Sequence, residues 1–216
     1  MNKLINIIQI NGVLTVKSGL SIGGTKSDIG IDTKDNPIIK NPLDNKPYIP
    51  GSSIKGKMRS LYEMNGLAKG QEFPCKCGKE NCFVCKLFGA HMNTKSNSGT
   101  PRLLFRDAKL TKEFYDLDEE QLIEIKTETM INRMTGTASN SSLRERERIA
   151  AGIKFDYTID ILIFEGDDEG KLIELVENGL KLIELTGLGG KTSAGYGQVD
   201  FGLNDETYKI IDKITT

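Results

Sequence analysis

The four cysteines of this chain lie within eleven residues, and this clustering constrains the fold more than any other feature. Their spacing is C-x-C-x4-C-x2-C, at Cys75, Cys77, Cys82 and Cys85. Disulfides that staple a fold are rarely clustered in this way, whereas four thiolates within short reach suit a tetrahedral Zn²⁺ ion. Because sulfur fills all four positions, we expect a closed, structural zinc knuckle rather than a catalytic zinc with an open position.

Composition narrows the class of protein. The 216 residues contain 29 Lys and Arg against 30 Asp and Glu, a net charge of −1, which excludes a basic-tail or an acidic solvating protein. The single histidine, His91, excludes a multi-histidine metal site within the chain, and we expect it in a loop. No stretch approaches the roughly 20 apolar residues of a membrane span, and residues 1–10 are more typical of a strand than of a signal peptide. We therefore expect no membrane contact and a reducing, cytoplasmic location.

Hydrophobic periodicity predicts two β-α-β units. We expect strands at 4–16, 102–109, 155–163 and 196–201, helices at 54–63 and 170–184, and an acidic helical patch near 113–124. Ser52 or Ser53 is expected to cap the first helix. The order β-α-β, insertion, β-α-β is typical of an α+β fold with a ferredoxin-like or RNA-recognition-motif-like palm. Long irregular segments interrupt it, at 17–50, about 66–100 and 126–152, and loops of such length inside a domain are usually functional.

Two basic segments indicate a polyanionic partner, although the net charge of the whole chain is nearly zero. Residues 38–60 contain five cations and one anion, and residues 126–154 contain six cations and three anions. The predicted helix N-terminus, with Gly51 and two serines before it, offers backbone N–H groups to a phosphate, and Lys55 and Arg59, four residues apart, share one helical face. The sequence therefore predicts that this region grips a phosphate chain. Solvated helix faces are the alternative.

The segment 187–197 contains five glycines. A nucleotide-binding P-loop is excluded because the first glycine of that motif would fall on Leu185. Two interpretations stay open: backbone N–H groups that approach a phosphate, or a bend that requires positive φ angles. The following residues partly match the aromatic RNA-recognition pattern, although Tyr196 and Phe201 are as consistent with a core position.

Several linked motifs together resemble the RAMP superfamily of CRISPR proteins, and more narrowly the Csm backbone subunit of type III-A effector complexes. The motifs are Asp35-Asn-Pro-Ile-Ile-Lys-Asn-Pro, Lys46-Pro-Tyr-Ile-Pro-Gly-Ser-Ser-Ile-Lys-Gly-Lys-Met-Arg59, Cys82-x-x-Cys-Lys-Leu-Phe-Gly89, Arg102-Leu-Leu-Phe-Arg-Asp-Ala108, Ile131-Asn-Arg-Met-Thr-Gly136, Leu143-Arg-x-x-Glu-Arg148 and the 187–197 turn. They run from about residue 19 to residue 201.

The resemblance implies a single RAMP domain over residues 1–216, with a zinc-knuckle loop at about 66–100 and a projecting thumb at 126–152. It implies copies of the chain stacked along a CRISPR RNA with other type III-A subunits. It also implies cleavage of paired target RNA at regular intervals, which requires a loop aspartate and a divalent metal such as Mg²⁺. The aspartate that matches is Asp35, with Asp32 second, and its role is metal binding or orientation of a 2′-hydroxyl.

The family motifs also assign the guide contacts. By resemblance and by charge, the RNA-binding residues are Ser52, Ser53, Lys55, Lys57, Arg59, Arg133, Gly189, Gly190 and Lys191. Three positions depart from the family pattern, because Ser21 stands in place of a frequent histidine, Asn132 in place of an aspartate and Ala194 in place of an arginine. The alternatives to an RNA-guided endoribonuclease are a non-catalytic guide-binding scaffold and a CRISPR RNA-processing endoribonuclease.

Overall fold

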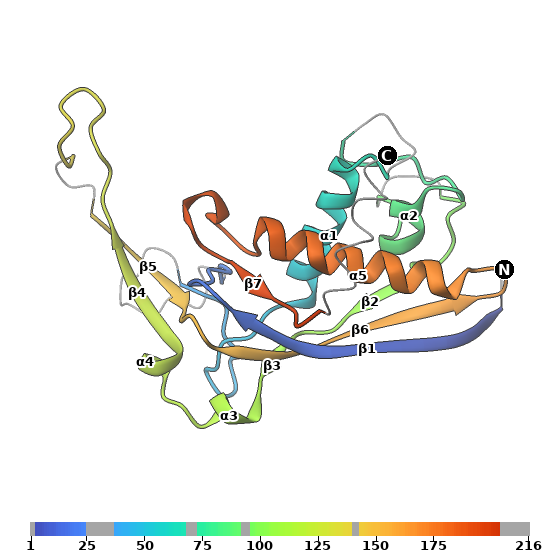
Figure 1. The fold of residues 1–216 in the computed structure, drawn as a ribbon, viewed down its shortest axis with the longest axis horizontal. Coiled ribbons are helices and arrows are strands. Elements are labelled where there is room, and N and C mark those ends of the chain that lie inside the picture. The colour runs from blue at the N-terminus through green and yellow to red at the C-terminus, as the bar shows by residue number, and fades with distance from the viewer. Residues whose placement is uncertain (1–2, 25–36, 68–72, 92–95, 140–142, 204–216) are drawn as a thin grey trace.

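A computed structural model describes residues 3–24, 37–67, 73–91, 96–139 and 143–203. Its main sheet is antiparallel, with strand order β2-β6-β1-β7 and β3 as a further partner of β6 (Figure 1). The strands are β1 (Leu4–Val16), β2 (Leu103–Phe105), β3 (Lys109–Leu110), β6 (Lys154–Phe164) and β7 (Val199–Asp200). The long β1 and β6 form the centre of this sheet. The chain contains both helices and strands, and the strands form an antiparallel sheet. This mixed architecture confirms the α+β prediction.

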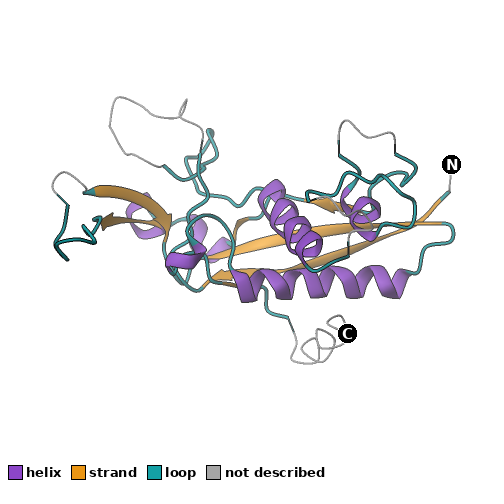
Figure 2. Ribbon diagram, turned by 90° about the horizontal axis from the view of Figure 1, so that it is seen from above, coloured by secondary structure: helices purple, strands orange, loops and turns teal. Residues whose placement is uncertain are grey.

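Two long helices cover one face of the sheet (Figures 1 and 2). They are α1 (Gly51–Met64) and α5 (Glu169–Thr186), and shorter helices are α2 (Phe83–Phe88), α3 (Lys112–Tyr115) and α4 (Glu119–Leu122). Apolar residues at helical spacing turn one side of each long helix towards the sheet. Within the described residues, no helix is both long enough and apolar enough to cross a membrane.

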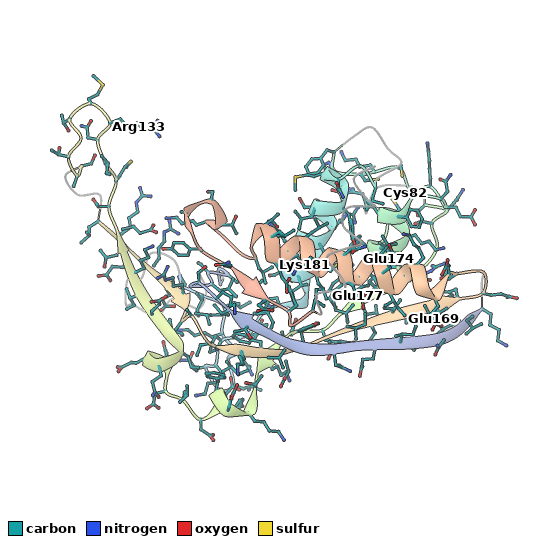
Figure 3. The ribbon with its side chains drawn as sticks, in the orientation of Figure 1. Cys82, Arg133, Glu169, Glu174, Glu177 and Lys181 are labelled. Atoms are coloured by element: carbon teal, nitrogen blue, oxygen red, sulfur yellow. The ribbon has the colours of Figure 1, made fainter. Side chains whose placement is uncertain are left out.

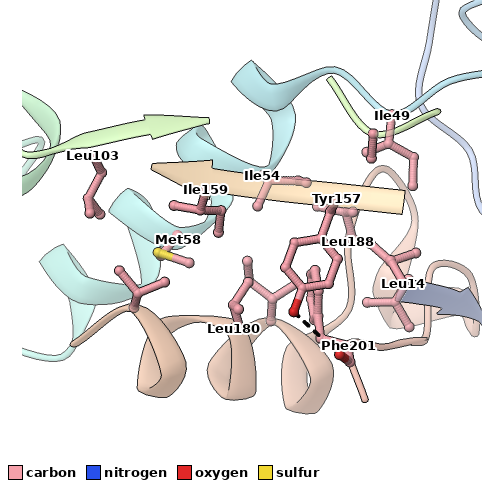
Figure 4. Packing of buried hydrophobic residues seen from close by; sticks show 14 of the residues in the cluster. Leu14, Ile49, Ile54, Met58, Leu103, Tyr157, Ile159, Leu180, Leu188 and Phe201 are labelled. Carbon is pink, nitrogen blue, oxygen red and sulfur yellow. Dashed lines mark hydrogen bonds between the residues drawn. The ribbon is translucent and has the colours of Figure 1, made fainter. Parts of the chain in front are cut away.

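The hydrophobic core lies between this sheet face and the two helices (Figure 4). Alternate residues of β6, including Tyr157 and Ile159, point into it, as the sequence alternation predicted. On α5, Gly179 allows close approach of α1, because a Cβ there would lie 2.7 Å from Met58 Cγ. Full burial of each large aliphatic side chain contributes roughly 1.5–3 kcal/mol, so this shared core holds the helices and sheet together.

A second, two-stranded antiparallel sheet projects from one end of the main sheet (Figures 1 and 2). It consists of β4 (Ile123–Glu128) and β5 (Arg144–Ile149), and we call the hairpin of residues 123–149 the thumb. The resemblance implied a projecting thumb at 126–152, whereas hydrophobic periodicity predicted no strand here and extended the acidic helical patch to residue 124. The strands were missed because charged residues occupy five of the six positions of β5 and three of the six positions of β4, so no apolar alternation marks β5.

Three element boundaries differ from the predictions. The helix α1 begins at Gly51 with Pro50 as its N-cap, and no serine side chain caps it; instead Gly51 N donates to Asp107 Oδ1 over 2.8 Å. The predicted strand 102–109 is divided into β2 and β3. The predicted strand 196–201 shrinks to two residues, because Gly195 and Gly197 adopt positive φ angles of 85° and 72°.

Candidate functional site

The four cysteine sulfurs converge at the end of the main sheet opposite the thumb, where Figure 3 labels Cys82. The Cys75 sulfur lies 3.5 Å from that of Cys77 and 3.8 Å from those of Cys82 and Cys85. A tetrahedral Zn²⁺ with Zn–S bonds of about 2.3 Å has sulfur–sulfur edges of about 3.8 Å. The donor set and its spacing therefore fit a closed four-sulfur site. Among the described residues, these cysteines are the only cluster of possible metal ligands, and His91 is outside it.

Burial makes two of these four thiols poorer acids. It raises the pKa of the Cys75 thiol and of the Cys85 thiol above their ordinary value. A metal that binds the cluster must displace those protons, because only the thiolate is a good ligand. Binding is therefore expected to weaken as the pH falls.

An ion pair on α1 joins this helix to both ends of the cysteine loop, the name used here for residues 75–89. Arg59 Nε lies 2.9 Å from Glu63 Oε1, and its two terminal nitrogens donate to the carbonyls of Gly89 and Cys75 at 2.9 and 3.2 Å. The same Glu63 oxygen accepts from Cys75 N over 3.2 Å. The sequence predicted Arg59 as a phosphate ligand; in the structure its guanidinium is engaged within the chain and braces the cysteine loop.

A second brace holds the other side of this loop. The Asp167 carboxylate, whose side chain is 2% exposed, pairs with Lys86 on α2 and with Arg102, each over 2.7 Å. Burial by itself would raise the pKa of Asp167, but the hydrogen bonds from Arg102 and Lys86 outweigh it and hold this pKa below its ordinary value of 3.8. Asp167 therefore stays ionised in the folded protein.

The loop that carries the predicted catalytic aspartates begins and ends at the base of the thumb. Asp35 and Asp32 themselves lie outside the described residues. At the two ends of the intervening segment, Gly24 N donates to Pro37 O over 3.0 Å, and Ile38 N donates to the thumb carboxylate of Glu147 over 3.2 Å.

The strand-like segment before this loop is joined to the thumb. Leu20 and Ile149 exchange two backbone hydrogen bonds, of 3.0 and 2.8 Å. Since Glu147 and Ile149 both belong to β5, a single thumb strand holds both ends of the loop. No local sequence signal marks Glu147, because its partners are about 110 residues away in the chain.

The glycine turn packs against the same segment. Gly190 N donates to Ser21 O over 2.9 Å, and a Cβ on Gly189, whose φ is 78°, would lie 2.5 Å from that same oxygen. Gly197 likewise has no room for a side chain, with a Cβ position 1.9 Å from Leu188 O. These contacts favour the interpretation as a close-packed bend, and the Gly190 N–H is already used within the chain.

The remaining predicted RNA-binding residues lie at three places. The first turns of α1 contain Ser52, Ser53, Lys55 and Lys57, and the glycine turn contains Lys191. Arg133 is on the thumb, far from the main sheet (Figure 3). Lys55 and Lys57 form no ion pair with any residue that the structure describes. Lys191 contacts the thumb carboxylate Glu128, so the turn and the thumb base come together. Tyr196 and Phe201 are each 2% exposed, as a core position requires.

Comparisons with known proteins agree with this architecture. The family model of the RAMP superfamily matches residues 13–200. The "CRISPR system Cms endoribonuclease Csm3" of Methanothermobacter thermautotrophicus is 38% identical over 208 residues, covering 89% of this chain and 82% of that relative. The Csm3 of Mycobacterium tuberculosis is 37% identical, covering 90% of this chain and 86% of that relative.

A solved structure shares the fold at lower sequence identity. It is a chain of the type III-B Cmr-β complex bound to cognate target RNA, with a TM-score of 0.60 and 21% identity. The match covers 91% of this chain and 59% of that chain. Because the family model spans most of the sequence and the Csm3 relatives align over most of both chains, this chain belongs to the RAMP superfamily, in its Csm3 group.

Proposed function

We propose that this chain is the Csm3-type backbone subunit of a type III-A CRISPR effector complex. In this proposal copies of the chain, with other subunits, bind a CRISPR RNA along its length and cleave the complementary target RNA at regular intervals. The main sheet with α1 and α5 is the ferredoxin-like, RNA-recognition-motif-like palm of a single RAMP domain over residues 1–216. The strand order β2-β6-β1-β7, with two helices on one face of the sheet, supports this assignment.

The observation that supports the endonuclease assignment is that both ends of the aspartate-bearing segment are held together at the base of the thumb. Gly24 and Pro37 are hydrogen-bonded to each other, and Glu147 of the thumb holds the loop end at Ile38. In this proposal a thumb that separates guide and target strands lies beside the two ends of the segment that carries the aspartates. Asp35, with Asp32 second, is proposed as the residue required for cleavage, by orienting a 2′-hydroxyl or by binding a divalent metal.

Two different metals are part of the proposal. Carboxylate oxygens are the donors that Mg²⁺ prefers, so a cation that supports cleavage is assigned to the aspartate loop. Four thiolates suit Zn²⁺ and not Mg²⁺, so the cysteine cluster is proposed as a structural zinc site far from the chemistry. Unlinked cysteines in this arrangement also fit a reducing, cytoplasmic compartment.

The guide contacts of the proposal come from three regions. Ser52, Ser53, Lys55 and Lys57 at the start of α1, Lys191 with Gly189 and Gly190 on the turn, and Arg133 on the thumb are assigned to the RNA backbone. We retain Arg59 only as a residue that positions the cysteine loop against α1, since its guanidinium is bonded to Glu63, Gly89 and Cys75.

The test is cleavage of a target RNA by the reconstituted complex with Mg²⁺, comparing wild type with Asp35→Ala and Asp32→Ala. We expect Asp35→Ala to abolish cleavage and to leave target binding unchanged. If Asp32→Ala alone abolishes cleavage, the function stands and the residue is reassigned. Unchanged cleavage in both variants would make this chain a non-catalytic scaffold.

A further inference from the structure

One carboxylate at the base of the thumb is surrounded by hydrogen-bond donors. Glu128, the last residue of β4, accepts a hydrogen bond from Tyr196 OH over 2.6 Å and is in contact with Lys191 Nζ. Arg146 of β5 places its Nε 3.6 Å from the same carboxylate. The donors come from the thumb and from the glycine turn, so Glu128 is the group on which the two elements meet.

Further cations surround the tyrosine of this cluster. The buried Tyr196 ring has Lys126 Nζ and the Arg148 guanidinium each 4.9 Å from its centroid, and Lys191 Nζ at 5.9 Å. Glu124 is the second anion, 2.6 Å from Arg148 Nε. Four cations therefore face two carboxylates around one aromatic ring, which leaves an excess of positive charge at this point.

We propose that this cluster binds one phosphodiester group of RNA and that Glu128 occupies its place in the RNA-free chain. A carboxylate and a phosphodiester both present two anionic oxygens, and the lysine, the arginine and the tyrosine hydroxyl can donate to either. This inference rests on the proposed function, because RNA is the polyanion that the proposal assigns to the chain.

The cluster is both accessible and well placed for that role. The side chains of Glu128 and Lys191 are 22% and 37% exposed, so a backbone phosphate can reach them from solvent. Gly19, which adjoins the cluster, lacks the Cβ that would lie 2.2 Å from Arg148 Cδ, so the segment leading to the aspartate loop packs directly on this arginine. A phosphate held here is next to the described segment that leads into the aspartate loop.

The state of Glu128 explains how it competes with RNA. The hydrogen bonds from Lys191 and Tyr196 hold the pKa of this carboxyl below its ordinary value of 4.5, so it is ionised at neutral pH. RNA must therefore exchange one anion for another at the same donors. Removing the charge of Glu128 is expected to favour RNA, whereas removing Lys191 is expected to disfavour it.

The experiment measures the affinity of the full chain for a fluorescently labelled single-stranded RNA oligonucleotide by anisotropy at low salt. Glu128→Gln is compared with wild type and with Glu145→Gln, a control on the neighbouring strand β5 that has the same change of charge and is exposed outside the cluster. We expect Glu128→Gln to bind about five-fold more tightly, and Glu145→Gln to change affinity less than two-fold, because an exposed charge contributes little. In a Lys191→Ala background the gain from Glu128→Gln should disappear.

A loss of RNA affinity in Glu128→Gln, or no change, would overturn the inference. If wild type binds RNA and Glu128→Gln binds equally or more weakly, Glu128 is only a latch between thumb and turn. Lys191→Ala is a second variant, and circular dichroism checks that it is folded: weaker RNA binding by the folded variant supports the site, and unchanged binding refutes it. Failure of wild type itself to bind the oligonucleotide would instead contradict the proposed function.

Discussion

Replacing Arg59 with alanine separates two roles that this residue was assigned, a phosphate ligand from sequence and a brace from structure. The substitution removes two hydrogen bonds to carbonyls, those of Gly89 and Cys75, each contributing about 1 kcal/mol to the free energy of unfolding. It also leaves Glu63, whose side chain is 4% exposed, without its cation. An uncompensated buried charge costs about 3–5 kcal/mol, but Glu63 keeps its bond from Cys75 N, and water can enter where the guanidinium was.

We therefore expect Arg59→Ala to lower the free energy of unfolding by about 3 kcal/mol in total. In a chain of this size such a loss lowers the midpoint of thermal unfolding by roughly 6–12 °C. Circular dichroism gives the midpoint, metal analysis gives the zinc content, and anisotropy gives RNA affinity on the same preparations. Zinc retention should fall as well, because Arg59 holds both ends of the cysteine loop.

Lys55→Ala is the matched control, one helical turn earlier on the same face of α1. Lys55 forms no ion pair with the described part of the chain, so the unfolding midpoint should stay within about 1 °C while RNA affinity falls. The reasoning is refuted if Arg59→Ala unfolds at the wild-type temperature with full zinc content and only RNA binding is lost. Arg59 would then be a phosphate ligand, as its position in the sequence predicted.

Three further predictions concern the metal, pH and the turn. Purified protein should contain one zinc per chain and lose cooperative unfolding with a chelator or in Cys82→Ser, whereas a zinc content well below one would contradict the four-sulfur site. The pKa of Asp167 is depressed by folding, so its stabilising contribution is complete above the ordinary value of 3.8 and is lost as the pH falls through the lower folded pKa. The urea midpoint should therefore decrease more from pH 6 to pH 3 in wild type than in Asp167→Asn, and equal decreases would count against the ion pairs. Gly189→Ala, with a Cβ 2.5 Å from Ser21 O at a positive φ, should cost about 1–3 kcal/mol in urea unfolding and slow target cleavage; full stability would exclude the close-packed turn.

The α+β class, the two long helices and the long central strands could be predicted from periodicity, because apolar residues at spacing of two or about 3.6 can bury only one face. The cysteine cluster could be predicted as well, since its four residues are close in sequence. The thumb strands could not, because their charged residues pair with one another across the hairpin and show no apolar pattern. The i, i+4 spacing of Arg59 and Glu63 was the one local signal of the brace, but the prediction of a basic helical face used the i, i+4 spacing of Lys55 and Arg59 instead.

Sequence alone determined which chemical groups this protein has: four clustered thiols, a basic helix start, a glycine-rich turn and an aspartate-bearing loop. Only the tertiary structure decided which of them meet. It placed the four-cysteine site and the thumb at opposite ends of the main sheet and engaged Arg59 and Gly190 within the chain. It also brought Glu128 into contact with Lys191 and Tyr196, which lie more than sixty residues further along the sequence. The physical reason is that spacing along the chain governs local contacts, whereas long-range partners are selected by burial and by the need to satisfy every buried polar group.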